Sequence, residues 1–477
     1  MNFHSFEFAA FFILVYILYL HLGHRAQNRM LLVASYVFYS AWDWRFLGLI
    51  LLSTITDYFC SHAIQNSDIA RIRKAYLWLS IIVNLSILGF FKYFHFFVDN
   101  FIDFFALFGL QLHAPLWQII LPVGISFYTF QTISYTIDVY RKQVKPAPQF
   151  LDYALYVSFF PQLVAGPIER GQRLLPQILQ PRTIRREQVT EGLFLIYWGL
   201  FKKIFIADNI GAYLQAIGDP AAPGVENGGL VLVYAYAFLF QIYCDFSAYS
   251  DIARGTAKLM GFELMINFRS PLFAPNFQEV WNRWHISLTT WIRDYLYYPL
   301  ALTPIRGKNL EPRLIVIITF LIMGLWHGAS WNFILWGLYC GVLLALYATW
   351  SAKTRRFMYQ ITGRKAQLLI LLSMMLTFNA GAFGILLFRA NSFEQLGSWV
   401  YHLFFNFSIN LEMLELFFRV ILHALPLLIF DALMYKKQDI QDLFYYPIIL
   451  RYAFFYLTLY LMVVHGAQSS AFIYFQF

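Results

Sequence analysis

The sequence predicts an all-α integral membrane protein. Hydrophobic residues make up 60% of the 477-residue chain and charged residues only 13%, whereas an ordinary soluble domain carries about 25% charged residues. The apolar residues also gather in long runs separated by short basic clusters, which is the arrangement that orients membrane helices. Because a soluble core has no room for this much apolar surface, lipid must be the solvent for most of the chain.

Apolar runs recur along the whole chain. A span needs roughly 20 residues, so we expect about eleven full transmembrane helices and two shorter or re-entrant pieces. The first run follows a segment without Lys or Arg and precedes no small-residue cleavage site, so we expect a retained helix and not a signal peptide. The runs lie near residues 5–22, 29–43, 45–63, 75–94, 116–138, 150–165, 190–210, 228–250, 313–327, 331–350, 367–388, 413–434 and 446–465.

The basic clusters predict the orientation of these helices. Cytoplasmic loops of membrane proteins are enriched in Lys and Arg. We therefore expect the weakly charged connections and the C-terminal tail, 466–477, to lie outside the cytoplasm. The clusters expected in the cytoplasm are 24–29, 71–74, 141–145, 306–313, 353–365 and 436–437.

Charge and cysteine usage narrow the class further. The net charge of +9 would suggest nucleic acid for a soluble protein, but basic residues that alternate with apolar runs orient helices instead, so no nucleic-acid partner is expected. Cys60, Cys244 and Cys340 lie in apolar stretches without metal-ligand spacing and are expected to be buried thiols. We expect no metal site and no bound cofactor.

A polar segment at 279–294 is the first candidate for chemistry. It is expected to form one helix, with Glu279, Arg283, Ser287, Thr290 and Asp294 on one face. The residues Asn282, His285 and Thr289 form an adjoining strip. A charged stripe in so apolar a protein faces a wet or functional cavity. The alternative is an amphipathic helix in the membrane interface.

A histidine inside the bilayer is the second candidate. His327 ends an apolar run that begins near Arg313, a distance of only ~21 Å at 1.5 Å per residue. Such a histidine is costly in lipid unless it is paired or lines a cavity. The alternative is an ordinary core histidine, but the polar segment 42 residues upstream favours a shared site.

Two aspartates form a third group. Asp245 and Asp251 follow a long apolar run, where intramembrane carboxylates pair with cations or mark a functional site. We expect them to act mainly as structural partners of Arg283 or Arg254, with a direct catalytic role as the alternative.

The motifs occur in an order that resembles a known family, the membrane-bound O-acyltransferases. The bacterial branch that acts in alginate and peptidoglycan O-acetylation and in teichoic-acid D-alanylation is the most similar. Each motif is weak, but the ordered set is specific and covers most of the chain. The matching stretches are 121–131, 165–170, 245–251, 281–285 and 325–328.

The resemblance implies a fold, a donor and site residues. The fold is a ring of helices around a central funnel or tunnel. Because the chain shows no long linker, low-complexity tract or clear internal repeat, we also expect 1–465 to form a single domain. His327 is the catalytic residue, and His285 is the second polar residue of the active site. The candidates for substrate binding or the tunnel are Asn282, Arg283, Asp245, Asp251 and Trp326. The donor is an acyl thioester, most simply acetyl-coenzyme A, presented at the cytoplasmic side.

The C-terminus adds a sharper expectation. Residues 472–477 match a Phe-x-Tyr-x-x-Phe pattern that resembles the end of a small partner peptide in D-alanylation systems, which implies that Tyr474 carries the acyl group. The alternative is an ordinary aromatic terminus.

The expected function is O-acetylation of a cell-envelope or extracellular polysaccharide. The protein would lie in a bacterial inner membrane among lipids and work with an extracytoplasmic acetyltransferase. The alternatives are a lipid or protein O-acyltransferase and a non-catalytic polysaccharide transporter.

Overall fold

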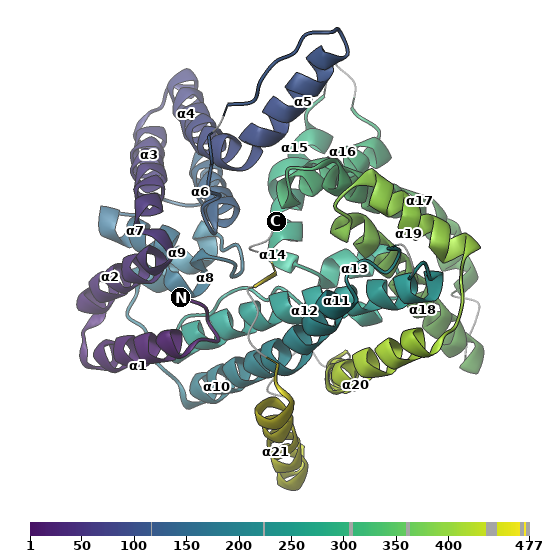
Figure 1. Cartoon of the computed structure of the whole chain (residues 1–477). Coiled ribbons are helices and arrows are strands. Elements are labelled where there is room, and N and C mark those ends of the chain that lie inside the picture. The colour runs from purple at the N-terminus through teal and green to yellow at the C-terminus, as the bar shows by residue number, and fades with distance from the viewer. Residues whose placement is uncertain are drawn as a thin grey trace. The chain divides into compact units, whose positions relative to one another are not determined.

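A computed structural model gives the architecture of this chain (Figure 1). It describes residues 1–477 except 116, 223–224, 305–308, 359–362, 436–445, 468–471 and 474–477, and it describes only the backbone of 351–358. Within these described ranges every regular element is helical, as predicted. The residues divide into two compact units, which are 1–196 with 252–265 and 197–251 with 266–477.

The first unit consists of the N-terminal helices and the end of α12. Its elements are α1 (Phe6–His21), α2 (His24–Asp43), η1 (Trp44–Phe46), α3 (Leu47–Asn66), α4 (Ala70–Leu88), η2 (Gly89–Tyr93), α5 (Phe94–Ala106), α6 (Ile125–Tyr140), α7 (Phe150–Ser158), α8 (Phe160–Leu163), α9 (Gly171–Leu179) and most of α10 (Arg186–Phe201).

The second unit contains most of α12 and the elements from η3 onward. They are η3 (Lys202–Ala207), α11 (Asp208–Ile217), α12 (Gly228–Leu259), η4 (Pro271–Phe273), α13 (Phe277–Arg283), α14 (Ile286–Ile292), η5 (Arg293–Tyr297), α15 (Tyr298–Leu302), α16 (Pro312–His327), α17 (Trp331–Met358), α18 (Arg364–Arg389), α19 (Phe393–Phe405), α20 (Leu411–Met434) and α21 (Ile448–His465).

Seven helical runs among the described residues are long and apolar enough to cross a membrane, so this is a multi-pass membrane protein. The helices α1 and α16 are apolar but shorter, with 16 residues each. The predicted number of eleven spans stays a prediction. The seven runs are 24–66, 70–106, 228–259, 331–350, 364–389, 411–434 and 448–465.

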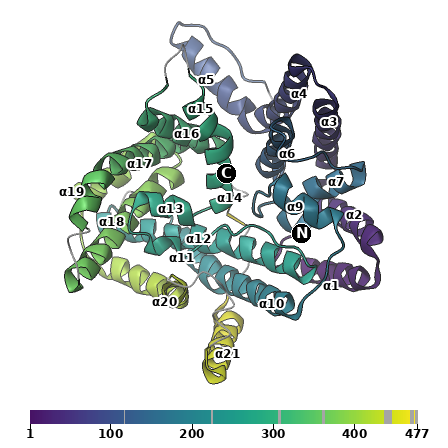
Figure 2. The same ribbon diagram turned by 180° about the vertical axis from the view of Figure 1, so that it is seen from behind.

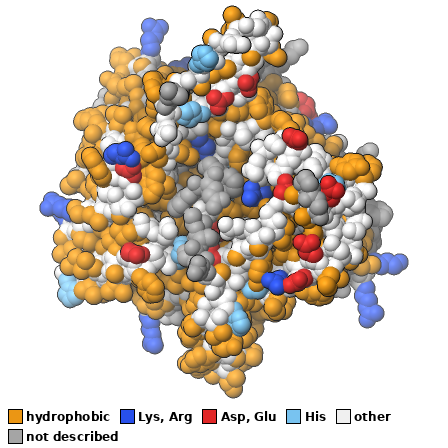
Figure 3. Space-filling model, in the orientation of Figure 1, with side chains coloured by type: hydrophobic (Ala, Val, Ile, Leu, Met, Phe, Trp, Pro, Cys, Tyr) orange, Lys and Arg blue, Asp and Glu red, His pale blue; other side chains and the backbone are white. Residues whose placement is uncertain are grey.

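Exposed apolar surface agrees with a lipid environment. In α21, only 6% of the most apolar stretch is buried, whereas in α12 the value is 83%. Figure 3 shows α21, at the bottom of the view, covered mainly by hydrophobic side chains. An apolar face of this size would be unstable in water. The helix α12 is therefore a core helix of the protein, and α21 presents its sides to lipid.

A polar cluster joins three helices inside the first unit. The Asp57 carboxylate on α3 accepts hydrogen bonds from Ser80 Oγ at 2.5 Å and from Asn84 Nδ2 at 2.9 Å, both on α4. Thr132 on α6 donates to Asn84 Oδ1 at 3.2 Å. Such hydrogen bonds hold membrane helices together where apolar packing alone is weakly selective.

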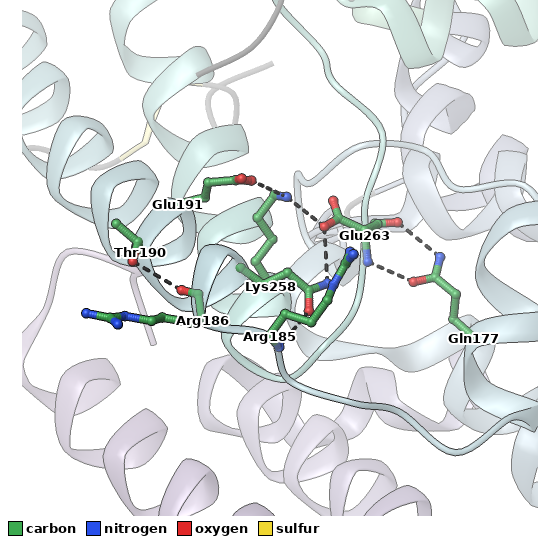
Figure 4. A network of polar contacts seen from close by, with 8 residues as sticks. Gln177, Arg185, Arg186, Thr190, Glu191, Lys258 and Glu263 are labelled. Atoms are coloured by element: carbon green, nitrogen blue, oxygen red, sulfur yellow. Dashed lines mark hydrogen bonds and ion pairs between the residues drawn. The ribbon is translucent and has the colours of Figure 1, made fainter. Parts of the chain in front are cut away.

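A second polar network lies where α10 begins and α12 ends. Lys258 Nζ lies 2.8 Å from a Glu191 carboxylate oxygen and 2.6 Å from Glu263 (Figure 4). Gln177 on α9 donates to the Glu263 carbonyl oxygen and accepts from its N–H. The network thus connects α9, α10 and the end of α12 to the segment that follows α12.

Candidate functional site

The position of His327 follows from the packing of α16 on α17. Glu311 caps the first turn of α16, since its carboxylate accepts the Leu314 N–H at 3.1 Å. The two helices lie side by side in Figures 1 and 2. Glycines allow this approach, because a Cβ at Gly324 would overlap the Phe333 carbonyl oxygen and lie 3.1 Å from Gly337 Cα. His327, the last residue of α16, is thereby held against α17.

Aromatic rings surround the His327 imidazole, which is 8% exposed. The Trp336 ring on α17 lies 5.1 Å away and nearly perpendicular, at 89°. The Phe388 ring on α18 lies 5.5 Å away. Both rings limit rotation of the imidazole, and such preorganisation is what a catalytic group requires.

His285 lies at a break between two helices, which corrects the prediction of one continuous helix over 279–294. The helix α13 ends at Arg283 and α14 begins at Ile286. His285 itself has φ 43° and ψ 52°, in the left-handed region that non-glycine residues rarely adopt outside functional or strongly constrained sites. The periodicity of the polar residues did not reveal the break, because both halves are helical.

Asn267, which the sequence reading did not single out, fixes this break. Its carbonyl oxygen accepts the Ile286 N–H at 2.9 Å, and its Oδ1 accepts the Ser287 N–H at 3.3 Å. Its Nδ2 donates to Ser250 Oγ on α12 at 3.0 Å. Asn267 therefore satisfies the first N–H groups of α14 and ties the His285 turn to α12. The sequence feature that could have identified Asn267 was its position in a polar segment between helices.

Because the helix is broken, the predicted polar stripe does not form. Glu279 and Arg283 pair with each other at 3.0 Å on α13. Ser287 is buried. On the far side of the break, the Thr290 hydroxyl donates to the Ile286 carbonyl oxygen at 2.8 Å, and Asp294 pairs with its neighbour Arg293. The five residues serve separate local contacts.

The two histidines share one apolar cavity of about 100 Å³ within the second unit. Helices α12, α13, α16, α17 and α18 and the His285 turn form its walls. The lining residues are Leu239, Ile242, Phe246, Phe277, Val280, Trp281, Trp284, His285, His327, Trp336, Tyr339, Cys340, Ala380, Gly381, Gly384, Ile385 and Phe388. Both predicted histidines therefore line the same cavity, and their roles in a site stay predictions.

Burial determines the charge of His285. The side chain is 1% exposed, and desolvation lowers the pKa of His285 to about 3. The imidazole is therefore neutral near pH 7, with one ring nitrogen as a donor and one as an acceptor. The Phe246 ring packs on it edge-on, with centroids 4.6 Å apart.

The other predicted site residues lie around this cavity and are absent from its described lining. Asn282 is exposed and donates to Glu279 at 3.2 Å. The Arg283 guanidinium lies over the Tyr435 ring at 4.7 Å. Trp326 is buried, with its ring 4.9 Å from that of His327 and 6.2 Å from that of His285. Trp326 thus lies near both imidazoles.

The two aspartates form ion pairs, but with lysines that the sequence reading did not name. Asp245 Oδ1 lies 2.9 Å from Lys203 Nζ, and Asp251 lies 2.7 Å from Lys202 Nζ. Both lysines are buried. They belong to the π-helical turn η3 between α10 and α11. Two adjacent lysines inside an apolar run were the available signal, since such charges need buried partners.

The predictions about Tyr474 and about metal binding remain. Tyr474 lies outside them, so nothing is observed of its position. Among the described residues no group of three or more His, Cys, Asp or Glu side chains has metal-binding geometry.

These observations define a class, namely multi-pass membrane proteins with two buried histidines on one apolar cavity. The family model of the membrane-bound O-acyltransferases matches residues 140–388, which includes every lining residue of that cavity. The chain belongs to this family, and its members are acyltransferases.

Curated relatives agree with this assignment. The probable alginate O-acetylase AlgI of Pseudomonas aeruginosa is 40% identical over 352 residues, 72% of this chain and 66% of the relative. The peptidoglycan O-acetyltransferase of Helicobacter pylori is 35% identical over 76% of this chain and 71% of its own length. The teichoic acid D-alanyltransferase of Bacillus subtilis is 26% identical over 60% and 72%. The match to this chain spans slightly less than two thirds of the alginate relative's length.

Proposed function

We propose that this protein is a membrane O-acyltransferase that moves an acyl group, most simply acetyl, from a cytoplasmic thioester across the membrane for O-acylation of a cell-envelope or extracellular polysaccharide. The observation that carries the proposal is the apolar cavity that His285 and His327 share. Two relatives are named as O-acetylases of alginate and peptidoglycan, which supports the acetyl group and the polymer acceptor.

In the proposed reaction, His327 acts as the general base. Its imidazole takes the proton from an acceptor hydroxyl, and the oxygen attacks the thioester carbonyl carbon. The tetrahedral intermediate collapses as the carbon–sulfur bond breaks, and the imidazolium returns the proton to the leaving thiolate. A neutral imidazole keeps one ring nitrogen with a free lone pair, and in this proposal that nitrogen accepts the proton.

The neutral ring of His285 has a complementary role in this proposal. Its N–H donates a hydrogen bond to the oxyanion of the tetrahedral intermediate. A preorganised donor in a water-poor cavity stabilises developing charge more than a donor in water does. The apolar lining also excludes water that would hydrolyse the thioester.

The proposal includes a relay through the C-terminal tail. Tyr474 is the first acceptor, its phenol leaves as an acyl ester, and an extracytoplasmic acetyltransferase passes the acyl group to the polymer. A phenol of pKa about 10 requires a base near neutral pH, and His327 supplies it. In the simpler form, the polymer hydroxyl is acylated directly.

The architecture and location of the protein are part of the proposal. They comprise about eleven spans in a ring around a tunnel, residues 1–465 as one domain and 466–477 outside the cytoplasm of a bacterial inner membrane. The tunnel has a physical purpose, since a large anionic donor such as acetyl-coenzyme A cannot cross hydrocarbon. Family membership favours acyl transfer over polysaccharide transport.

Mass spectrometry with isotope-labelled acetyl-coenzyme A tests this function. Wild type, His327→Ala, His285→Ala and Tyr474→Phe are compared for label on the protein and for acylated polymer in cells. The proposal expects label on Tyr474 in wild type and its loss in His327→Ala and Tyr474→Phe. Normal polymer acylation in His327→Ala cells would refute the catalytic assignment, and normal acylation in Tyr474→Phe cells would refute the relay alone.

A further inference from the structure

Two residues near the C-terminus of the chain make a specific contact with α12. Phe472 and Ile473 are only 3% and 4% exposed and belong to the second unit. The Phe472 ring lies 4.8 Å from that of Tyr249 and 6.1 Å from that of Phe246. The Ile473 N–H donates to Asp245 Oδ2 at 2.6 Å. Ring packing and a backbone hydrogen bond thus hold two consecutive residues.

The acceptor in this contact is itself held by charge. Asp245 Oδ1 lies 2.9 Å from Lys203 Nζ, and the same ammonium lies 2.8 Å from Asp208 Oδ1. The side chains of all three residues are at most 4% exposed. Because Lys203 engages one oxygen of Asp245, the other oxygen is oriented toward the Ile473 N–H. A hydrogen bond to an ionised carboxylate is roughly twice as strong as a neutral one.

The same stretch of α12 contacts the candidate active site. Phe246 follows Asp245 in the chain, lines the cavity and packs on the His285 ring at 4.6 Å. One residue therefore touches both the imidazole and the side chain of Phe472. The C-terminal segment is fixed next to the wall of the cavity, one residue before Tyr474 in the sequence.

We infer that Asp245, Lys203 and Asp208 form a clamp for the C-terminal segment of this chain. The clamp recognises the backbone N–H of residue 473 and an aromatic side chain at residue 472. Asp245 is a positioning residue in this arrangement, since it acts through the segment that it binds.

The use of the clamp rests on the proposed function. If Tyr474 accepts an acyl group, its side chain must return to the same position in each turnover. A fixed contact at residues 472 and 473 would provide this positioning. A 1 Å misplacement of a reacting group costs about a hundredfold in rate. The clamp itself, as a binding contact, does not depend on that chemistry.

Hydrogen–deuterium exchange of the full-length protein in lipid nanodiscs tests the clamp directly. The readout is exchange in peptides that cover 466–477. Asp245→Ala removes the acceptor and leaves Lys203 paired with Asp208 alone, so one cation then faces one carboxylate and no buried cation loses its only partner. Phe472→Ala removes the ring contact without touching any charge. Exchange of the tail should accelerate at least ~10-fold in Asp245→Ala, as loss of a charge-assisted hydrogen bond predicts, and should also rise in Phe472→Ala.

A matched control separates the clamp from general loosening of the fold. Asp431→Ala removes another buried carboxylate of the second unit, which accepts the Tyr243 hydroxyl at 2.7 Å. It should leave tail exchange at the wild-type rate. Wild-type tail exchange in both Asp245→Ala and Phe472→Ala would overturn the clamp. Equal acceleration in Asp431→Ala would also overturn it, because the effect would then be global.

Acyl labelling of Tyr474 in the same variants tests the positioning role. Released tails with little label would support it, whereas a released tail with normal label would refute positioning and leave the proposed function intact. Absence of label in wild type, together with tail release in Asp245→Ala, would refute the relay and leave the clamp intact.

Discussion

Gly337→Ala tests whether the contact between α16 and α17 positions His327. A Cβ at residue 337 would lie 3.1 Å from the Phe320 carbonyl carbon and 3.2 Å from Gly324 Cα, and closer still to the Phe320 carbonyl oxygen. These are backbone atoms, so no side-chain rotation relieves the overlap. Ordinary carbon contacts of about 3.5–4.0 Å return only if the helices separate by roughly 0.5–1 Å.

Two effects should follow from this separation. Overpacking of this kind costs ~1–3 kcal/mol of stability. His327 on α16 would also move relative to Trp336 on α17, whose ring lies 5.1 Å away, and a shift of about 1 Å predicts a loss of acyl transfer of about a hundredfold. The assays are thermal unfolding in detergent and transfer of labelled acetyl groups.

The control is Gly397→Ala on α19, where an added Cβ meets nothing within 4 Å. Replacing a helical glycine at an open position should be neutral or stabilise by ~0.5–1 kcal/mol. Wild-type stability and activity in Gly337→Ala would refute the reasoning. A stable Gly337→Ala protein without activity would support the positioning effect alone.

Three other substitutions test separate parts of the site. The pKa of His285 is about 3 in the folded protein and about 6.5 in the unfolded chain, so protonation of the unfolded chain increasingly favours unfolding as the pH falls from 6.5 toward 3. His285→Gln removes this titration and should make the free energy of unfolding less dependent on pH in that range. An unchanged pH profile of unfolding would contradict this expectation. Asn267→Ala removes the side-chain acceptor of the Ser287 N–H, so it should lower the stability measured by thermal unfolding by ~1–3 kcal/mol. It should also reduce kcat by a larger factor than it raises KM, and an equally large rise of KM would count against it. Lys203→Met leaves Asp208 and Asp245 without their shared cation and should lower the free energy of unfolding by ~3–5 kcal/mol. Arg419→Met breaks an exposed ion pair and should lower it by only ~0–1 kcal/mol. Similar losses for both variants in denaturant unfolding would contradict this contrast.

The histidine pair could be predicted because two independent signals met. A histidine near the end of an apolar run and a polar segment upstream each required a cavity or a partner. Their positions in the ordered set of motifs then linked them. Both histidines line one cavity, although no periodicity in the sequence measures how close two helices lie.

The break at His285 shows where pattern reasoning failed. Helical spacing continues through 279–294 in the sequence, so the pattern predicts one helix. The actual turn requires a left-handed residue and the bonds from Asn267. The hydrogen bond to Ser287 comes from a residue 20 positions earlier in the chain, and local helix propensity contains no information about it.

The helical membrane class and the family could be predicted from the chain alone, because hydrophobic runs, basic clusters and ordered motifs are local properties of the sequence. Tertiary structure alone decided which groups meet: Lys203 with Asp245, Asn267 with Ser287, and Ile473 with Asp245. The physical reason is that a buried charge or N–H specifies only that it must have a partner. Which partner it finds depends on how helices distant in sequence pack against one another.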